Sequence, residues 1–155
     1  MSVYRYFPDK YAIAEALALR HWDGFATSIE RLAEEDEREP VADPVTAILE
    51  VLSDGFRAAP AFRALWYSPL RTQQLRDATR PTRERFAASL ARMLAARWPH
   101  AGPQLREQAA RTVVLVGDGL LREAFRVDPH GDAALLAEAR IVLNAYLDAR
   151  LGPRS

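Results

Sequence analysis

The chain has 155 residues, 49% of them hydrophobic and 27% charged, and its 21 basic and 21 acidic residues give a formal net charge of zero at pH 7. This length and composition predict one globular domain with a sizeable core. The absence of cysteine excludes disulfides and thiolate chemistry, and without a signal-peptide pattern or an apolar run near the ~20 residues of a membrane span we expect a cytoplasmic protein.

The first element in chain order is an aromatic segment, VYRYFPDK, that predicts a helix end, a break and a helix start. Pro8 disfavours helical geometry at Phe7, and Asp9 is a suitable N-cap for a helix that begins at Lys10. From Lys10 to about residue 35, apolar residues recur with the 3.6-residue period of a helix. The charged run over residues 34–40 predicts a surface connection.

The middle of the chain predicts helices separated by prolines. Asp43 followed by Pro44 is a strong start signal, because the carboxylate caps the helix and proline suits its first position. This helix is expected to reach about residue 56, and a short helix follows over residues 60–67. Between residues 70 and 98 the helical pattern contains Pro81. Proline inside a helix costs roughly 3 kcal/mol or more, so we expect a kink or a new start near Thr79.

The last third of the chain predicts two long helices. The first covers residues 104–127, and the second begins after Asp132, which is placed as its N-cap. No stretch of useful length alternates as a strand does. We therefore predict an all-α protein, an antiparallel bundle of about six helices in one domain.

The N-terminal segment and the helix after it resemble the tetracycline-repressor (TetR) family of bacterial transcription regulators. In that family a Leu-Tyr-x-His/Tyr-Phe pattern ends the DNA-recognition helix, and a Lys then opens a long connecting helix. Here Val3 takes the Leu place, followed by Tyr4, Tyr6, Phe7 and Lys10.

The resemblance implies a division of the chain and a set of partners. Residues 1–9 correspond to the end of the recognition helix, and residues 10–152 to the effector-binding and dimerisation domain. Tyr4, Tyr6 and Lys10 match positions that contact the DNA backbone. The helices before the recognition helix are absent from this sequence, so we expect specific DNA binding only when they are present.

Aromatic residues from the helices before the last two form a candidate ligand site. They either fill the core or surround an apolar pocket, and the resemblance favours a pocket for a small apolar or aromatic effector. Asp118, between two glycines, either faces that pocket or is an exposed carboxylate. The candidate ligand-binding residues are Trp22, Phe25, Phe56, Phe62, Trp66, Phe86 and Asp118.

The last two helices have more apolar surface than one bundle needs, with runs such as residues 113–116 and 141–143 that are apolar on every side. Such surface requires a partner, and in the resembled family these two helices form the homodimer interface. The candidate interface residues are Val113, Val116, Leu120, Leu136, Leu143 and Tyr146.

Signals for an enzyme are weak. His21, His100 and His130 stand apart without metal-ligand spacing, and no phosphate-binding loop or activated nucleophile is recognisable. We expect no catalysis, no cofactor and no metal. The arginines of residues 57–111 are either an anion-attracting region or solvated helix faces.

The sequence hypothesis is a ligand-responsive transcriptional regulator of the TetR type, in the role of a repressor. The alternative is an autonomous helical interaction protein that forms heterodimers with a full-length regulator and modulates it.

Overall fold

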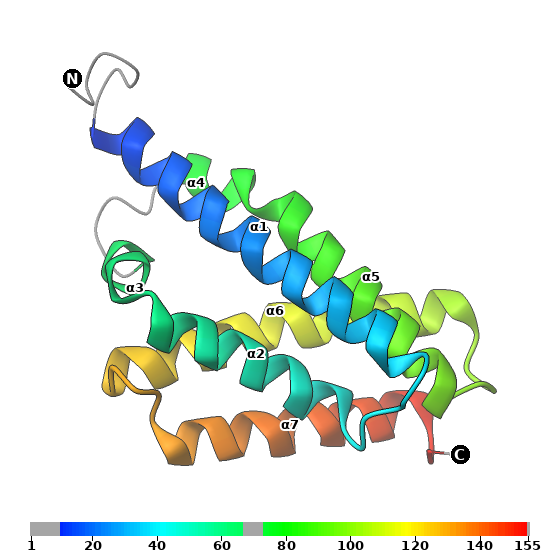
Figure 1. The fold of residues 1–155 in the computed structure, drawn as a ribbon. Coiled ribbons are helices and arrows are strands. Elements are labelled where there is room, and N and C mark those ends of the chain that lie inside the picture. Colours follow the sequence, from blue (N-terminus) through cyan, green and yellow to red (C-terminus); the bar gives the residue numbers. More distant parts are fainter. Residues whose placement is uncertain (1–9, 67–72, 155) are drawn as a thin grey trace.

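A computed structural model describes residues 10–66 and 73–154 of the chain, and within these residues the ordered elements are seven helices and no strands. Figure 1 shows their arrangement. The helices are α1 (Lys10–Asp36), α2 (Pro44–Ala58), α3 (Pro60–Trp66), α4 (Gln73–Ala78), α5 (Arg80–Arg97), α6 (Pro103–Val127) and α7 (Ala133–Leu151). The all-α prediction is confirmed.

Local chemistry sets the helix boundaries where the sequence predicted them. The Asp43 carboxylate accepts hydrogen bonds from the backbone N–H groups of Val45 and Thr46, at 3.0 and 3.2 Å, and Pro44 opens α2. The new start near Thr79 is also present, since α4 ends at Ala78 and α5 begins one residue after Thr79. Both starts place proline in the first helical turn, where its missing N–H has no intrahelical partner to lose.

The C-terminal helices form a hairpin. Asp132 caps α7 by accepting the N–H of Leu135 at 2.8 Å, as predicted. In Figure 1, α6 and α7 lie side by side and run in opposite directions. The C-terminal end of α7 is tied to the end of α5, where the Trp98 indole N–H donates to the Gly152 carbonyl at 2.6 Å.

Helices α1 and α5 are long neighbours that run in the same direction (Figure 1). The order of the ion pairs along them shows this: Arg85 binds Glu30, and Arg92, about two turns further on, binds Glu37, the residue after the end of α1. The antiparallel pattern predicted from the sequence therefore describes neighbours such as α6 and α7, whereas α1 and α5 are parallel.

The ion pairs between the α1 region and α5 use two of the arginines of residues 57–111, Arg85 and Arg92. Arg85 donates to both oxygens of Glu30, each at 2.7 Å, and to Asp23 at 2.6 Å. The bonds from Arg85 are the main cause that lowers the pKa of Glu30. These groups are partly exposed, and exposed pairs typically contribute less than about 1 kcal/mol. Their main effect is to align an acidic helix with an arginine-rich one.

Candidate ligand cavity

A cavity of ≈ 50 Å³ lies inside the bundle, and five helices contribute to its wall. Helix α2 provides a stripe with the i, i+3, i+4, i+7 spacing of one helix face, and α1, α5, α6 and α7 complete the enclosure. The lining residues are Trp22, Val45, Ile48, Leu49, Leu52, Arg83, Phe86, Leu90, Val113, Val114, Gly117, Asp118, Leu121 and Leu143. The wall is therefore mostly aliphatic, with the rings of Trp22 and Phe86 beside the aliphatic side chains.

Gly117 is a buried glycine in the interior of α6, where it lines the cavity. A Cβ atom built on it would lie 3.4 Å from Cδ1 of Leu143 on α7, which is about an ordinary van der Waals contact. The spacing of α6 and α7 therefore does not by itself require glycine there. Gly119, in contrast, is exposed, and a Cβ atom added there would meet no atom within 4 Å, so space does not require glycine at that position.

The six predicted aromatic residues gather in space, but most of them pack against one another. The ring of Trp22 lies 4.8 Å from that of Trp66, and Phe25 stacks on Phe56 at 5.7 Å. Trp22, at the centre of this cluster, also contacts the rings of Phe62 and Phe86.

The cavity lies beside this cluster rather than within it. Trp22, Phe86 and Asp118 are in its wall, whereas Phe25, Phe56, Phe62 and Trp66 do not line it. Those four rings fill the core, which was the other interpretation of the sequence. The aliphatic stripe of α2 and Arg83 of α5 are wall residues that the sequence analysis did not single out.

The polar residues of the wall are few. Asp118 forms an ion pair with Arg122, one turn further along α6, and their side chains are 20% and 28% exposed. The guanidinium of Arg122 also lies 5.8 Å from the centroid of the Trp66 ring. Arg83 is the other charged residue of the wall. The buried Nε1 atom of Trp22 has no hydrogen-bond partner in the described part of the chain.

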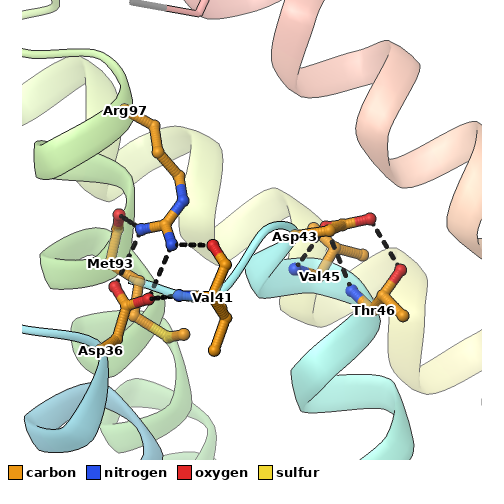
Figure 2. A network of polar contacts seen from close by, with 7 residues as sticks. All are labelled: Asp36, Val41, Asp43, Val45, Thr46, Met93 and Arg97. Carbon is orange, nitrogen blue, oxygen red and sulfur yellow. Dashed lines mark hydrogen bonds and ion pairs between the residues drawn. The ribbon is translucent and has the colours of Figure 1, made fainter. Parts of the chain in front are cut away.

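A second polar arrangement fastens the C-terminal end of α1 (Figure 2). The buried Arg97 guanidinium donates to both carboxylate oxygens of Asp36, at 2.8 and 2.6 Å, and to the Met93 carbonyl at 2.7 Å. It also bonds to the carbonyl of Val41, whose own N–H donates to Asp36 at 2.8 Å. Arg97 of α5 thereby holds both the end of α1 and the connection to α2.

Asp36 is the one exception to the predicted surface connection over residues 34–40, whose other residues are exposed. Asp36 is only 3% exposed. Burial alone would raise its pKa, but the hydrogen bonds from Arg97 and from the Val41 N–H, together with the charge of Arg97, outweigh burial and lower the pKa below 3.8. The carboxylate is thus held ionised inside the protein.

The predicted interface residues of α6 and α7 divide into two groups. Val113, Leu136 and Leu143 are at most 7% exposed and belong to the core of the single chain, so they have almost no surface left to bury against a second copy. Leu120 and Tyr146 are half-buried against that core.

Outside this core, α6 and α7 each expose an adjacent apolar pair. Leu115 is 67% and Val116 40% exposed on α6, and Ile141 is 61% and Val142 44% exposed on α7. Each pair lies within two residues of the contact between Gly117 and Leu143. Of these four residues only Val116 was among the predicted interface residues, because an unbroken apolar run does not show which face is outward.

The predicted DNA contacts Tyr4 and Tyr6 lie outside the described residues, and Lys10 is exposed at the first position of α1. In the described part of the chain no three histidine, aspartate or glutamate side chains come together as a metal site. None of the helices in the two described ranges is long and apolar enough to cross a membrane.

Comparison with known proteins gives one family and one solved structure. Residues 39–151 match the family described as "Tetracyclin repressor-like, C-terminal domain". A crystal structure of a TetR-family transcriptional regulator from Streptomyces coelicolor is similar, with 28% sequence identity and a TM-score of 0.58 over 96% of this chain and 78% of that chain. No curated protein matches the sequence.

Proposed function

The chain belongs to the tetracycline-repressor (TetR) family of transcriptional regulators, and on this premise we propose that it is a ligand-responsive repressor whose effector occupies the cavity beside Trp22. The observation that carries the proposal is the aliphatic cavity itself, which is enclosed by helices from both ends of the sequence. Ligand sites are typically apolar and measure about 300–1,000 Å³, so in this proposal the effector widens the cavity of ≈ 50 Å³ when it binds.

Trp22 connects the cavity to α1. Its ring is part of the cavity wall and also contacts Trp66 and Phe86, so a ligand that widens the cavity displaces Trp22 and with it the middle of α1. The C-terminal end of α1 is held by the buried Asp36–Arg97 pair. Displacement at Trp22 therefore moves the N-terminal end of α1 more than the C-terminal end.

This geometry suits a regulator of the family. A ligand shifts a conformational equilibrium only by binding one state more tightly than the other, and here the two states differ in the tilt of α1. In the proposed mechanism the helix-turn-helix precedes α1, Tyr4, Tyr6 and Lys10 contact the DNA backbone, and the tilt lowers the affinity for the operator.

The test compares a cavity-filling variant with a matched control. Leu49→Phe adds a ring to the cavity wall, whereas Leu147→Phe adds the same ring at a buried position outside the cavity. A thermal-shift screen of small apolar molecules should find ligands for the wild type and for Leu147→Phe but not for Leu49→Phe. A ligand at 100 times its dissociation constant stabilises the folded protein by ~2.7 kcal/mol. Equal binding by all three proteins would place the effector elsewhere.

We further propose a homodimer in which α6 and α7 of two copies meet through Leu115, Val116, Ile141 and Val142. Exposed apolar pairs on adjacent helices are unfavourable in water, and stable homodimers bury roughly 2,000 Å² or more in total. In light scattering, Ile141→Glu should shift the protein towards monomer. The control Leu17→Glu, at a 49% exposed position of α1, should leave the dimer intact, and a dimeric Ile141→Glu variant would contradict this interface.

A further inference from the structure

We infer that Gly117 is a specificity-determining residue of the cavity: because it has no side chain, it leaves room for the apolar body of the effector against the backbone of α6. This inference rests on the proposed function, since it concerns the same cavity and the ligand that widens it. Three observations carry it, namely the free space beside Gly117, the contrast with the other glycines, and the cost of glycine inside a helix.

The space beside Gly117 is open although the residue is buried. Gly117 lies in the middle of α6 and is part of the cavity wall. Beyond the adjacent residues and the nearby backbone of its own helix, a Cβ atom built on it would have one heavy atom within 4 Å, Cδ1 of Leu143 at 3.4 Å. Protein interiors are close-packed, so a buried Cβ position with a single such neighbour borders a void. That void is the cavity, which Leu143 also lines.

The other glycines of the chain have different environments. A Cβ atom at Gly55 would lie 2.2 Å from Cε1 of Phe25, so packing requires glycine there. Gly131 and Gly152 have φ angles of 88° and 87°, which side chains rarely adopt. Three more are exposed, and a Cβ atom on them would meet nothing within 4 Å: Gly24, Gly102 and Gly119. Among the seven glycines, all in the described residues, Gly117 is the one that is buried where an alanine would fit.

Glycine at this position lowers the stability of the folded chain. Inside a helix it is less favourable than alanine, because it loses more conformational freedom on folding. The contact of an added Cβ atom with Leu143 is about an ordinary van der Waals distance, and a methyl group beside the void would bury additional apolar surface. Alanine would therefore favour folding on both counts. What alanine would remove is the open space, and an effector in the cavity uses that space.

The size of the cavity makes one carbon atom significant. The space measures ≈ 50 Å³, so it has to widen for an effector, and a methyl group on Gly117 would reduce the space from which the widening starts. One methylene more or less in an apolar pocket changes binding by roughly 10–200-fold. Gly117→Ala should therefore weaken binding by at least about tenfold.

The experiment measures binding of toluene, butylbenzene and cyclohexane by calorimetry, and the Tm of each protein without ligand. Gly117→Ala should raise Tm by about 1–4 °C and weaken binding of the best probe by at least about tenfold. The matched control is Gly24→Ala, at an exposed helix position outside the cavity wall. It should raise Tm by a similar amount and leave the dissociation constants unchanged.

A compensating variant separates lost space from a stiffer α6. Ile48→Val removes one carbon atom from the part of the wall that α2 provides. The double variant Gly117→Ala/Ile48→Val should therefore recover part of the binding that Gly117→Ala loses. A loss that the second substitution leaves unchanged would assign the effect to the backbone of α6 and overturn the role of space.

The remaining outcomes distinguish this inference from the proposed function. If Gly117→Ala lowers Tm while Gly24→Ala raises it, packing requires the glycine and the inference is overturned. If Gly117→Ala binds the probes as tightly as the wild type while Leu49→Phe does not bind them, the inference is overturned and the effector cavity stands. If the wild type binds none of the probes, the effector cavity is overturned and this inference with it.

Discussion

The buried pair of Asp36 and Arg97 should be the most sensitive polar contact in the described structure, and Arg97→Met tests it. Methionine keeps much of the length of the arginine stem but removes the guanidinium and its charge. The side chains of Arg97 and Asp36 are 10% and 2% exposed, so water cannot replace the lost bonds without opening the end of α1. The variant leaves the Asp36 carboxylate buried with the Val41 N–H as its remaining donor.

The expected loss follows from this uncompensated charge. Removing one partner of a buried ion pair typically costs roughly 3–5 kcal/mol, because the other charge stays desolvated. For a chain of this length a loss of 1 kcal/mol lowers Tm by about 2–4 °C. We therefore expect Arg97→Met to unfold about 6–20 °C below the wild type. The double variant Asp36→Leu/Arg97→Met should recover part of the loss, because it removes the buried charge but not the unmet carbonyls of Val41 and Met93.

The dependence on pH provides a second, independent signature. In the wild type the pKa of Asp36 is lowered below 3.8, so its contribution to stability is fully present at higher pH and is lost only as pH falls through that lowered pKa. Without Arg97, burial dominates and raises the pKa of Asp36 above its unfolded value. Protonation then stabilises the folded variant, so the difference from wild type should shrink as pH falls from about 7.5 to about 4.5.

The assay is urea unfolding at several pH values, with Arg92→Met as control. Arg92 lies on the same helix and pairs with Glu37, but the two side chains are 44% and 59% exposed. Such a pair contributes about 0–1 kcal/mol, and its loss should not produce the same pH effect. The reasoning fails if Arg97→Met costs no more than Arg92→Met, or if its deficit is the same at both ends of that pH range.

Two substitutions of glycine should change stability in opposite directions in urea unfolding: Gly55→Ala should destabilise by roughly 1–3 kcal/mol, because its Cβ atom would lie 2.2 Å from Cε1 of Phe25. A Cβ atom added at Gly24 would meet no atom within 4 Å, so Gly24→Ala should stabilise α1 by about 0.5–1 kcal/mol. If both variants changed the free energy of unfolding in the same direction, the space around the glycine would not be the deciding factor. Asp43→Ala should cost about 1–2 kcal/mol, since it removes the cap of α2 and the bond that Asn144 donates to Asp43 at 2.7 Å. Burial alone would raise the pKa of Asp43. The hydrogen bonds from Thr46, Asn144 and Val45 outweigh burial, so the pKa is lowered from its ordinary value. The difference between Asp43→Ala and wild type should therefore be constant near neutral pH and decrease only as the pH falls through the lowered pKa of Asp43. A cost that already falls close to neutral pH would contradict this assignment.

The helix boundaries were predictable because the interactions that set them are local. Asp43 followed by Pro44, the break at Thr79 and the cap at Asp132 each depend on residues within one turn of the helix end. The aromatic set was also identified, since apolar periodicity shows which residues turn away from water. The family resemblance, carried by residues 3–10, agrees with the match over residues 39–151.

The details of the candidate site depend on how whole helices are rotated against one another, and no local pattern contains that information. The run of residues 113–116 is apolar on every side, and only packing against α5 and α7 turned Val113 inward and left Leu115 67% exposed. The same holds for the charges. Asp36 stands in a run of acidic residues, and only the approach of Arg97 from α5, 61 positions away in the sequence, makes it a buried partner instead of a surface group. Such long-range pairs form when the helices dock, and that docking also left the space between α2 and α6 that we propose the ligand occupies.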